Sequence, residues 1–326
     1  MTGNKIYFIK KSLFFILLFA LIPAIFGQKE QIQYMPHWLP QAQFAGYYIA
    51  LKNGFYEKEG LDVEIIHPSP TDNVIELLNN GNVDIISSFL MTAINYHSQG
   101  YDLVNFCQLS QNCGQLFVAK KKSNITTIAD LNGKKIGIWN AGFDEIPLAF
   151  IRDKGCNVEW VPVLTSVDLF LLDGIDVSTV MWYNEYNQII NSGINEDELN
   201  TFFFSDYGYN IPEDGLYCLK ETHNNKSQAL RKFINATLKG WEYAFENQDE
   251  TINLVMEKMK IAHVPTNRAH QEWMLEKMQE LFSLKQKPIS KGVLYKEDYI
   301  NAFELLQSHG KIDKNTKPDY ESFYIK

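Results

Sequence analysis

The stretch Gln31–Ile66 constrains the fold of this chain more than any other segment. Its apolar run Ile32–Met35 predicts a strand, and the prolines that follow cannot continue a hydrogen-bonded ladder. Aromatic and aliphatic residues then recur at helical spacing over Phe44–Leu51. Gly54 ends that helix, and Leu61–Ile66 predicts a second strand. The stretch therefore predicts a strand–helix–strand unit of an α/β fold.

The turn of this unit supplies two candidate ligand contacts. In open α/β sheets, ligands bind at the carboxyl ends of the strands. Trp38 lies at that end of the first strand, and Gln43 opens the helix. A tryptophan there either packs within its own loop or stacks on a flat ligand. Both alternatives remain open from these residues alone.

Other strand ends also carry polar and aromatic residues. Ser87 and Ser88 follow the apolar run Val83–Ile86 and precede a helix, where hydroxyls either cap the helix or donate to a ligand. Glu185 also follows a strand, either as a solvated helix cap or as an acceptor for a ligand amine. The predicted site is a cleft lined by Trp38, Gln43, Ser69, Ser87, Ser88, Asn140, Gly142, Phe143, Tyr183, Asn184 and Glu185.

This set of side chains suits a small, flat, neutral or cationic heterocycle. Aromatic rings supply stacking area, and a few polar groups fix the ligand's orientation. Arginine is absent from all of these turns, which disfavours a sulfonate, nitrate or phosphate ligand. The chain also lacks the G-x-S-x-G, H-E-x-x-H, P-loop and G-x-G-x-x-G motifs. We therefore predict a binding protein and not an enzyme, with no cofactor and no metal.

Two polar segments predict a division into two α/β lobes. The cationic run Lys120–Asn124 predicts the first crossing between the lobes, and the glycine-containing stretch Asp206–Gly215 predicts the return. An apolar stripe over Ala229–Phe245 predicts a core-facing helix, and the polar tail beyond Lys311 is predicted to be loose. We expect lobe 1 to comprise residues 28–118 and 213–326, and lobe 2 to comprise residues 119–212.

The amino-terminal residues 1–27 predict a secretory signal peptide. Three lysines there precede the apolar run Leu13–Phe26 of 14 residues, which is short for a membrane span. An uncleaved anchor is the alternative. Without these lysines the net charge of −9 becomes −12, which disfavours a nucleic-acid partner because phosphate binding requires a basic surface. A cleaved signal predicts a periplasmic protein.

The four cysteines, Cys107, Cys113, Cys156 and Cys218, match no zinc-binding spacing. An oxidising compartment permits disulfides. Buried free thiols are the simplest expectation, and a Cys107–Cys113 bridge is the alternative.

The segments WLPQAQFAGYY and NGFYEKEGLDVEI, which begin at Trp38 and Asn53, carry a resemblance to a known family. They resemble the opening of periplasmic solute-binding proteins for thiamine pyrimidine precursors. That class is similar to the yeast hydroxymethylpyrimidine-phosphate synthase and, more distantly, to alkanesulfonate- and nitrate-binding proteins. The resemblance implies the two-lobed type II periplasmic-binding fold, a hydroxymethylpyrimidine or formylaminopyrimidine ligand, and an ABC permease as partner. YNEY at Tyr183–Tyr186 and the loop around Gly142 resemble that class's ligand-contacting segments.

The same resemblance argues against synthase chemistry. After the Gly81–Asp84 segment, Ser88 stands where the synthase has its lysine and Thr92 where it has its consumed histidine. Of the synthase's clustered cysteines, only Cys218 is present in the matching region. The alternatives to a pyrimidine importer are a receptor for riboflavin or an alkanesulfonate, or one that feeds a sensor kinase.

Overall fold

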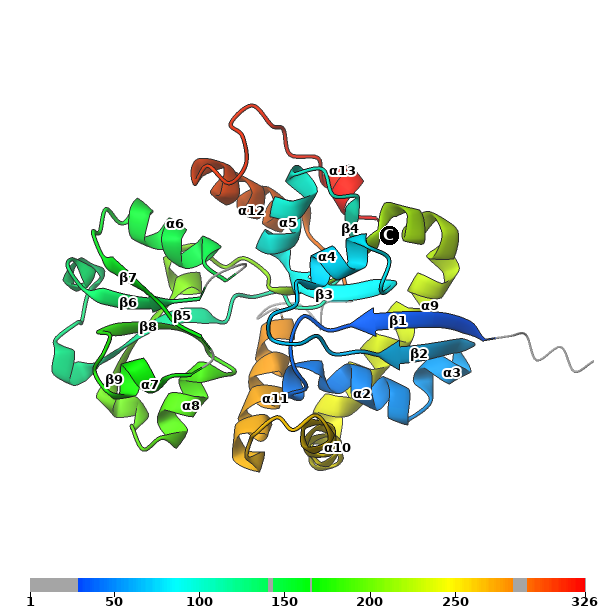
Figure 1. Cartoon of the computed structure of the whole chain (residues 1–326), viewed down its shortest axis with the longest axis horizontal. Helices are drawn as coiled ribbons and strands as arrows, with labels where there is room; N and C mark the ends of the chain where they lie inside the picture. Colours follow the sequence, from blue (N-terminus) through cyan, green and yellow to red (C-terminus); the bar gives the residue numbers. More distant parts are fainter. Residues whose placement is uncertain (1–28, 140–142, 165, 284–291, 326) are drawn as a thin grey trace, which may run out of the picture.

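The computed structural model describes residues 29–139, 143–164, 166–283 and 292–325, and it shows two α/β lobes side by side (Figure 1). The signal peptide predicted for residues 1–27, together with Asn140 and Gly142, lies outside the described residues. Each lobe is built on a five-stranded sheet. No helix in the described part of the chain is both long and apolar enough to cross a membrane.

Lobe 1 contains the first sheet and most of the helices. Its strands are β1 (Glu30–Met35), β2 (Leu61–Ile65), β3 (Ile85–Phe89), β4 (Leu103–Gln108) and β10 (Asp214–Leu219), in the order β2-β1-β3-β10-β4. Its helices are η1 (Ala42–Phe44), α2 (Ala45–Lys52), α3 (Phe55–Lys58), α4 (Val74–Asn79), α5 (Leu90–Ser98), α9 (Lys220–Glu246), α10 (Gln248–Ile261), α11 (Arg268–Phe282), α12 (Lys296–Ser308) and α13 (Tyr320–Phe323).

Lobe 2 contains the second sheet. Its strands are β5 (Gln115–Lys120), β6 (Lys135–Ile138), β7 (Glu159–Pro162), β8 (Val177–Met181) and β9 (Leu199–Phe203), in the order β7-β6-β8-β5-β9. Its helices are η2 (Lys121–Ser123), η3 (Ile128–Leu131), α6 (Glu145–Asp153), α7 (Asp168–Leu171), α8 (Glu185–Asn191), η4 (Glu196–Glu198) and η5 (Phe204–Tyr207).

The strand–helix–strand unit predicted from Gln31–Ile66 is present as β1, α2 and β2. β1 and β2 are parallel, with Ile32 opposite Val63. β10 runs antiparallel between β3 and β4, so lobe 1 is completed only by chain that has returned from lobe 2. The carboxyl ends of β1 and β3 therefore face lobe 2 beside the start of β10.

The first crossing lies earlier than predicted. β5 pairs with β8 and β9, so it belongs to lobe 2, although residues 115–118 were assigned to lobe 1. The chain crosses after β4, between Gln108 and Gln115, and Lys120–Asn124 is instead the outer end of lobe 2. Lys120 is held there by its ammonium group, which donates to Leu171 O and Asp173 Oδ1. The return crossing lies between β9 and β10, within the predicted stretch.

The apolar stripe predicted within Ala229–Phe245 is buried in α9, where it packs against α2. The two helices approach closely because both present glycine at the contact. A Cβ added to Gly240 would lie 2.1 Å from Gly46 O, and one added to Gly46 would lie 2.3 Å from the Trp241 ring. This contact fixes α2, and with it the turn after β1, against the lobe 1 core.

The last residues of the carboxyl-terminal tail are packed, although the whole tail beyond Lys311 was predicted to be loose; residues 313–319 are exposed. Phe323 in α13 is fully buried, and the Ile325 amide donates to Asn105 O on β4. A local excess of polar residues concealed this anchor, which depends on a distant strand. The four cysteines are free in this structure, with Cys107, Cys113 and Cys218 buried.

Candidate binding cleft

The turn after β1 is tied to the end of β3. The His37 backbone N–H donates to Ser87 Oγ at 3.0 Å, and His37 Nδ1 lies 2.8 Å from the same oxygen. Ser87 and Ser88 were predicted to start a helix, but both lie within β3, since α5 begins only at Leu90. Successive strand residues face opposite sides of a sheet, so Ser87 faces His37 and Ser88 faces away.

Gln43 is the polar centre of the cleft. It is 2% exposed, and its Nε2 lies 3.2 Å from His37 Nε2, 3.2 Å from Tyr183 Oη and 3.1 Å from Asp214 Oδ2. Tyr183 follows β8 in lobe 2, whereas Gln43 and Asp214 belong to lobe 1. The predicted residues Gln43 and Tyr183 therefore meet across the cleft.

Aromatic rings from both lobes meet beside this polar centre. The Phe143 ring of lobe 2 makes edge-to-face contacts with Phe89, at 4.9 Å between centroids, and with Trp38, at 6.5 Å. The neighbouring cavity, which Phe89, Phe143 and Met181 help to line, measures about 20 Å³. That volume holds about one water molecule, so this cavity as it stands is too small for a ring-sized ligand.

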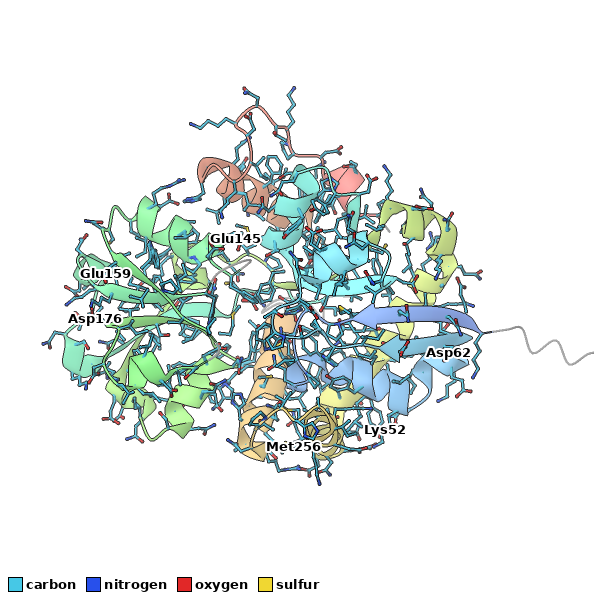
Figure 2. The ribbon with its side chains drawn as sticks, viewed as in Figure 1. Lys52, Asp62, Glu145, Glu159, Asp176 and Met256 are labelled. Carbon is cyan, nitrogen blue, oxygen red and sulfur yellow. The ribbon has the colours of Figure 1, made fainter. Side chains whose placement is uncertain are left out.

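Four buried carboxyl groups surround the cleft. Burial raises the pKa of Glu145, Glu185 and Asp214 to about 7 and, together with the adjacent Asp214 charge, that of Glu213 to about 8. Figure 2 shows Glu145 on the side of α6 that faces lobe 1. His37 Nε2 lies 3.8 Å from Asp214 Oδ1, but burial lowers the pKa of His37 to about 3 and keeps the ring neutral. Among the described residues, no lysine or arginine forms an ion pair with these four groups.

The segment Tyr183–Glu185 starts α8 and is extensively hydrogen-bonded. The Glu185 carboxylate accepts from the Met181 backbone N–H at 3.1 Å and from Asn184 Nδ2 at 2.7 Å. Asn184 Oδ1 accepts from Gln188 Nε2 and lies 3.1 Å from His270 Nε2 on α11. Glu185 is therefore a buried structural acceptor and not the solvated cap that was the alternative. Ligand contact by Asn184 or Glu185 stays a prediction.

The structure leaves some predicted residues apart from the centre of the cleft. Ser69 is exposed, and its N–H donates to Asp72 Oδ2 within its own loop. Ser88 is buried on β3 opposite Gly215 of β10. The structure brings together Trp38, Gln43, Ser87, Phe143 and Tyr183.

Sequence reasoning missed Phe89, Glu213 and Asp214. The two acidic residues lie in a segment predicted only as a crossing, and only their position at the start of β10 brings them to the cleft. Glu213 joins the two crossings, because its Oε1 accepts from the Gly114 N–H at 2.6 Å. Adjacent acidic residues at the return crossing were the available signal.

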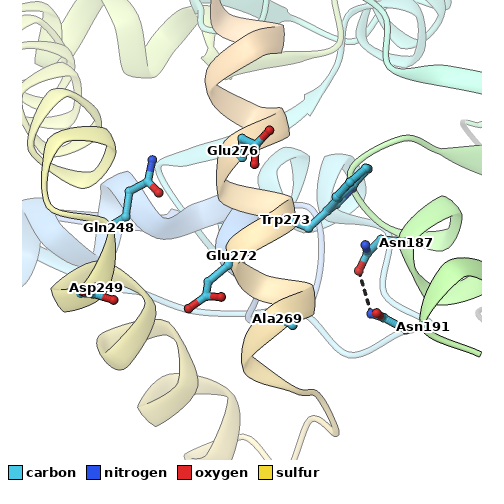
Figure 3. A pocket seen from close by; sticks show the side chains of 8 residues that line it. All are labelled: Asn187, Asn191, Gln248, Asp249, Ala269, Glu272, Trp273 and Glu276. Carbon is cyan, nitrogen blue, oxygen red and sulfur yellow. Dashed lines mark hydrogen bonds between the residues drawn. The ribbon is translucent and has the colours of Figure 1, made fainter. Parts of the chain in front are cut away.

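A second inter-lobe contact lies between α8 and α11. Trp273 extends from α11 toward α8 (Figure 3), and its indole N–H donates to Trp182 O at 2.8 Å. An open groove of about 490 Å³ lies beside it, lined by side chains of α8, α10 and α11. Its acids Asp249 and Glu272 are paired with Arg268. This contact joins the lobes on the side of the lobe 2 sheet where α8 lies.

Comparison with known proteins places this geometry in a family. The model of the NMT1/THI5-like family matches residues 41–251. The chain is 32% identical over 229 residues to a putative thiamine biosynthesis protein from Haemophilus influenzae, covering 68% of this chain and 71% of the relative. It is 25% identical to the formylaminopyrimidine-binding protein of Halalkalibacterium halodurans, over 77% of this chain and 78% of the relative.

The fold is also that of solved periplasmic binding proteins. The aliphatic sulphonate-binding protein SsuA from Escherichia coli superimposes with a TM-score of 0.70 at 14% identity, covering 90% of this chain and 97% of SsuA. The likeness to a yeast 4-amino-5-hydroxymethyl-2-methylpyrimidine phosphate synthase from Saccharomyces cerevisiae is partial, at 27% identity over 33% of this chain and 32% of the enzyme. The two-lobed periplasmic-binding fold predicted from the sequence is thereby confirmed, and the chain belongs to the NMT1/THI5-like family.

Proposed function

We propose that this protein is the substrate-binding component of an ABC importer and holds a thiamine pyrimidine precursor between its lobes. The observation that carries the proposal is the composition of the inter-lobe site. Aromatic rings from both lobes meet beside a carboxyl–amide–imidazole cluster, and no described lysine or arginine is ion-paired there. Such a site favours a flat ring bearing N–H donors over an anion.

The relatives support the same ligand class. One is named a formylaminopyrimidine-binding protein and another a putative thiamine biosynthesis protein. Hydroxymethylpyrimidine and formylaminopyrimidine share a flat ring with an exocyclic amine. A pyrimidine stacked on Trp38, with its amine directed at the Gln43–Asp214 pair, would use the groups that the cleft offers.

The function requires a location and a partner. We propose that residues 1–27 direct export to the periplasm and that the ligand-bound, closed form docks on an inner-membrane permease. Lobe closure is the device that couples the two steps, since contacts such as Gln43–Tyr183 form only when the lobes meet. No bond in the ligand needs to be made or broken in this role.

A thermal-shift panel tests the proposal. The panel contains hydroxymethylpyrimidine, formylaminopyrimidine, riboflavin and an alkanesulfonate. A ligand at a hundredfold excess over its Kd stabilises the folded state by about 2.7 kcal/mol, so we expect a clear rise in Tm with a pyrimidine and recovery of that ligand unchanged. Stabilisation by riboflavin or the sulfonate, with none by either pyrimidine, would refute the assignment of the ligand.

A further inference from the structure

Asp214 has fewer hydrogen-bond donors than Glu213 and Glu185, the buried carboxyl groups beside it and on the opposite lobe. Glu213 accepts from the Gly114 backbone N–H, and Glu185 accepts from the Met181 N–H and from Asn184. The Asp214 side chain is 5% exposed, and among the described residues Gln43 is its recorded donor. A carboxylate has two oxygens that can each accept more than one hydrogen bond, and a buried acceptor without donors is costly.

Gln43 cannot satisfy all the acceptors that surround it. Its amide nitrogen carries two hydrogens, yet it faces His37 Nε2, Tyr183 Oη and both oxygens of Asp214, at 3.1 to 3.3 Å. The other end of the amide is occupied, because Gln43 Oε1 accepts from Gln41 Nε2 at 2.6 Å. Two amide hydrogens cannot bond to four atoms at once, so at least one Asp214 oxygen or another of these atoms lacks a Gln43 donor.

The neighbouring imidazole does not correct this imbalance. The His37 backbone N–H and Nδ1 both lie within hydrogen-bond distance of Ser87 Oγ. When Nδ1 carries the proton and donates to Ser87, Nε2 is a further acceptor that faces the Gln43 amide. When Nε2 carries the proton instead, its N–H faces the N–H donors of Gln43. It then lies 3.8 Å from Asp214 Oδ1, which is too far for a hydrogen bond.

The position of the cluster makes it accessible to a ligand. Gln43 and Asp214 belong to lobe 1, and Tyr183, which covers them, belongs to lobe 2. Separation of the lobes would break the Gln43–Tyr183 contact and open this side of the cluster toward the cleft. The aromatic rings of Trp38 and Phe89 lie on the same lobe, beside the turn that carries His37.

We propose that Asp214, oriented by Gln43, accepts the N–H donors of the ligand's amino group and so makes the cleft selective for amino-substituted rings. This inference rests on the proposed function and adds a specificity-determining residue to it. The ligand supplies the donors that the protein lacks. A ring with an oxo group or a dialkylated amine at the same position presents no N–H donor there to Asp214 and is rejected.

Titration calorimetry with three probes tests the proposal. The probes are 4-amino-5-hydroxymethyl-2-methylpyrimidine, its 4-dimethylamino derivative and its 4-oxo counterpart. At pH 8, above the raised pKa of Asp214 of about 7, we expect the wild-type protein to bind the amine at least tenfold more tightly than either analogue, because a charge-assisted hydrogen bond is lost with each. In Asp214→Asn, whose amide can donate to an oxo group, we expect affinity for the amine to fall at least tenfold and the preference over the oxo ring to vanish.

A matched control separates this effect from general loss of a buried acid. Asp298 on α12 is half-buried, with its pKa also raised, to about 6, but it lies outside the cleft, so Asp298→Asn should keep the wild-type preference. Equal binding of the amine and its dimethylamino derivative by the wild-type protein would overturn the inference while leaving the proposed function intact. Unchanged preference in a folded Asp214→Asn would overturn it as well. Binding of none of the three probes by the wild-type protein would instead refute the proposed function.

Discussion

Each lobe contributes a buried carboxyl group to the cleft, and the two groups differ in how many hydrogen-bond donors they have. Asp214 on the lobe 1 wall and Glu185 on the lobe 2 wall are both buried, and burial raises the pKa of each to about 7. The Glu185 carboxylate is satisfied by the Met181 N–H and by Asn184. The Asp214 carboxylate shares a single amide with other acceptors. Burial and pKa therefore do not distinguish a carboxyl group available to a ligand from one that has a structural role. The number of hydrogen-bond donors that the protein provides to the group does.

The difference has a simple origin in the backbone. Glu185 is the first residue of α8, where its side chain can reach back to the N–H at the end of β8. Asp214 is the first residue of β10, and its backbone carbonyl accepts from Leu109 and Ser110 in the crossing. These bonds fix the backbone of Asp214 but leave its side chain to the cleft. Lobe 1 is thus equipped to recognise a ligand, and lobe 2 to close on it.

The pH dependence of stability gives the largest test of this comparison. For both acids the folded pKa, about 7, exceeds the ordinary values of 3.8 for Asp214 and 4.5 for Glu185, so the folded state holds more protons between these limits. Each group's contribution to stability is present below pH 4 and is lost as pH rises through 7, a change on the order of 3 kcal/mol. Buried neutral His37 and His270 act in the opposite direction below pH 6.5.

The variants Asp214→Asn and Glu185→Gln isolate these two contributions. In denaturant unfolding between pH 4.5 and 8, each variant should gain stability relative to the wild-type protein as pH rises. Saturating aminopyrimidine should remove that gain for Asp214→Asn, because the ligand's donors stabilise the carboxylate, and should leave it for Glu185→Gln. If the ligand had the same effect on both variants, the conclusion that, of these two acids, only Asp214 of lobe 1 contacts the ligand would be contradicted.

Removal of the Glu185 side chain should mainly affect stability. Glu185→Ala leaves the Met181 N–H and the Asn184 amide without their acceptor, at a cost of about 2 to 3 kcal/mol. Equilibrium unfolding in urea measures this cost, and Glu185→Gln, which keeps one acceptor oxygen, should lose less. If Glu185→Ala left the free energy of unfolding unchanged but greatly weakened ligand binding, Glu185 of lobe 2 would be a ligand contact and not a structural acceptor.

Removal of the Trp38 ring should mainly affect binding. Trp38 is partly exposed at the end of β1 and contacts Phe143 across the cleft. Trp38→Ala should weaken pyrimidine binding by about 10- to 100-fold, since stacking of a base on an aromatic ring contributes about 1 to 3 kcal/mol. Trp38→Phe keeps an aromatic face and should retain most of the affinity in calorimetry. A Trp38→Ala protein with wild-type affinity would show that the ring is only a loop residue.

The smallest expected effect concerns closure. Trp273→Phe keeps an aromatic ring at this position but replaces the larger indole and removes the N–H that donates to Trp182 O across the lobes. The closed form should lose about 1 kcal/mol, which appears as a roughly fivefold weaker affinity and a larger radius of gyration in small-angle scattering. Discrimination between amino and oxo rings should not change, because the α8–α11 contact touches neither Gln43 nor Asp214. A change in discrimination would show that lobe 2 also selects the ligand.

The sequence predicted the helices, which depend on neighbouring residues, but not the lobe to which each strand belongs, which depends on distant ones. Apolar residues at helical spacing identified both α2 and α9, and Gly54 marked the end of α2, because burial of one helix face depends on nearby residues. The crossing at Lys120 was misplaced for the opposite reason. Whether the strand Gln115–Lys120 belongs to one sheet or the other is decided by its pairing with Val177–Met181, which no local pattern contains.

The candidate site was predictable on its aromatic and amide side only. Trp38, Gln43 and Tyr183 each follow a strand or open a helix, so their types and positions suggested a cleft. Asp214 had no such signal, since its partner Gln43 lies 171 residues away and the intervening chain builds the whole of lobe 2. The state of Glu185 was equally hidden, because only the structure shows which donors satisfy it.

The strand order of lobe 1 has a consequence for how the chain folds during synthesis. β10 begins at Asp214 and separates β3 from β4, so the first sheet cannot close until that late strand is available. The second sheet uses only residues 115–203 and can be completed earlier. Long-range pairings of this kind slow folding because a large loop must close first. The amino-terminal half of lobe 1, which carries Trp38 and Gln43, must therefore remain an incomplete sheet until β10 has been synthesised, whereas the inserted lobe can fold before then.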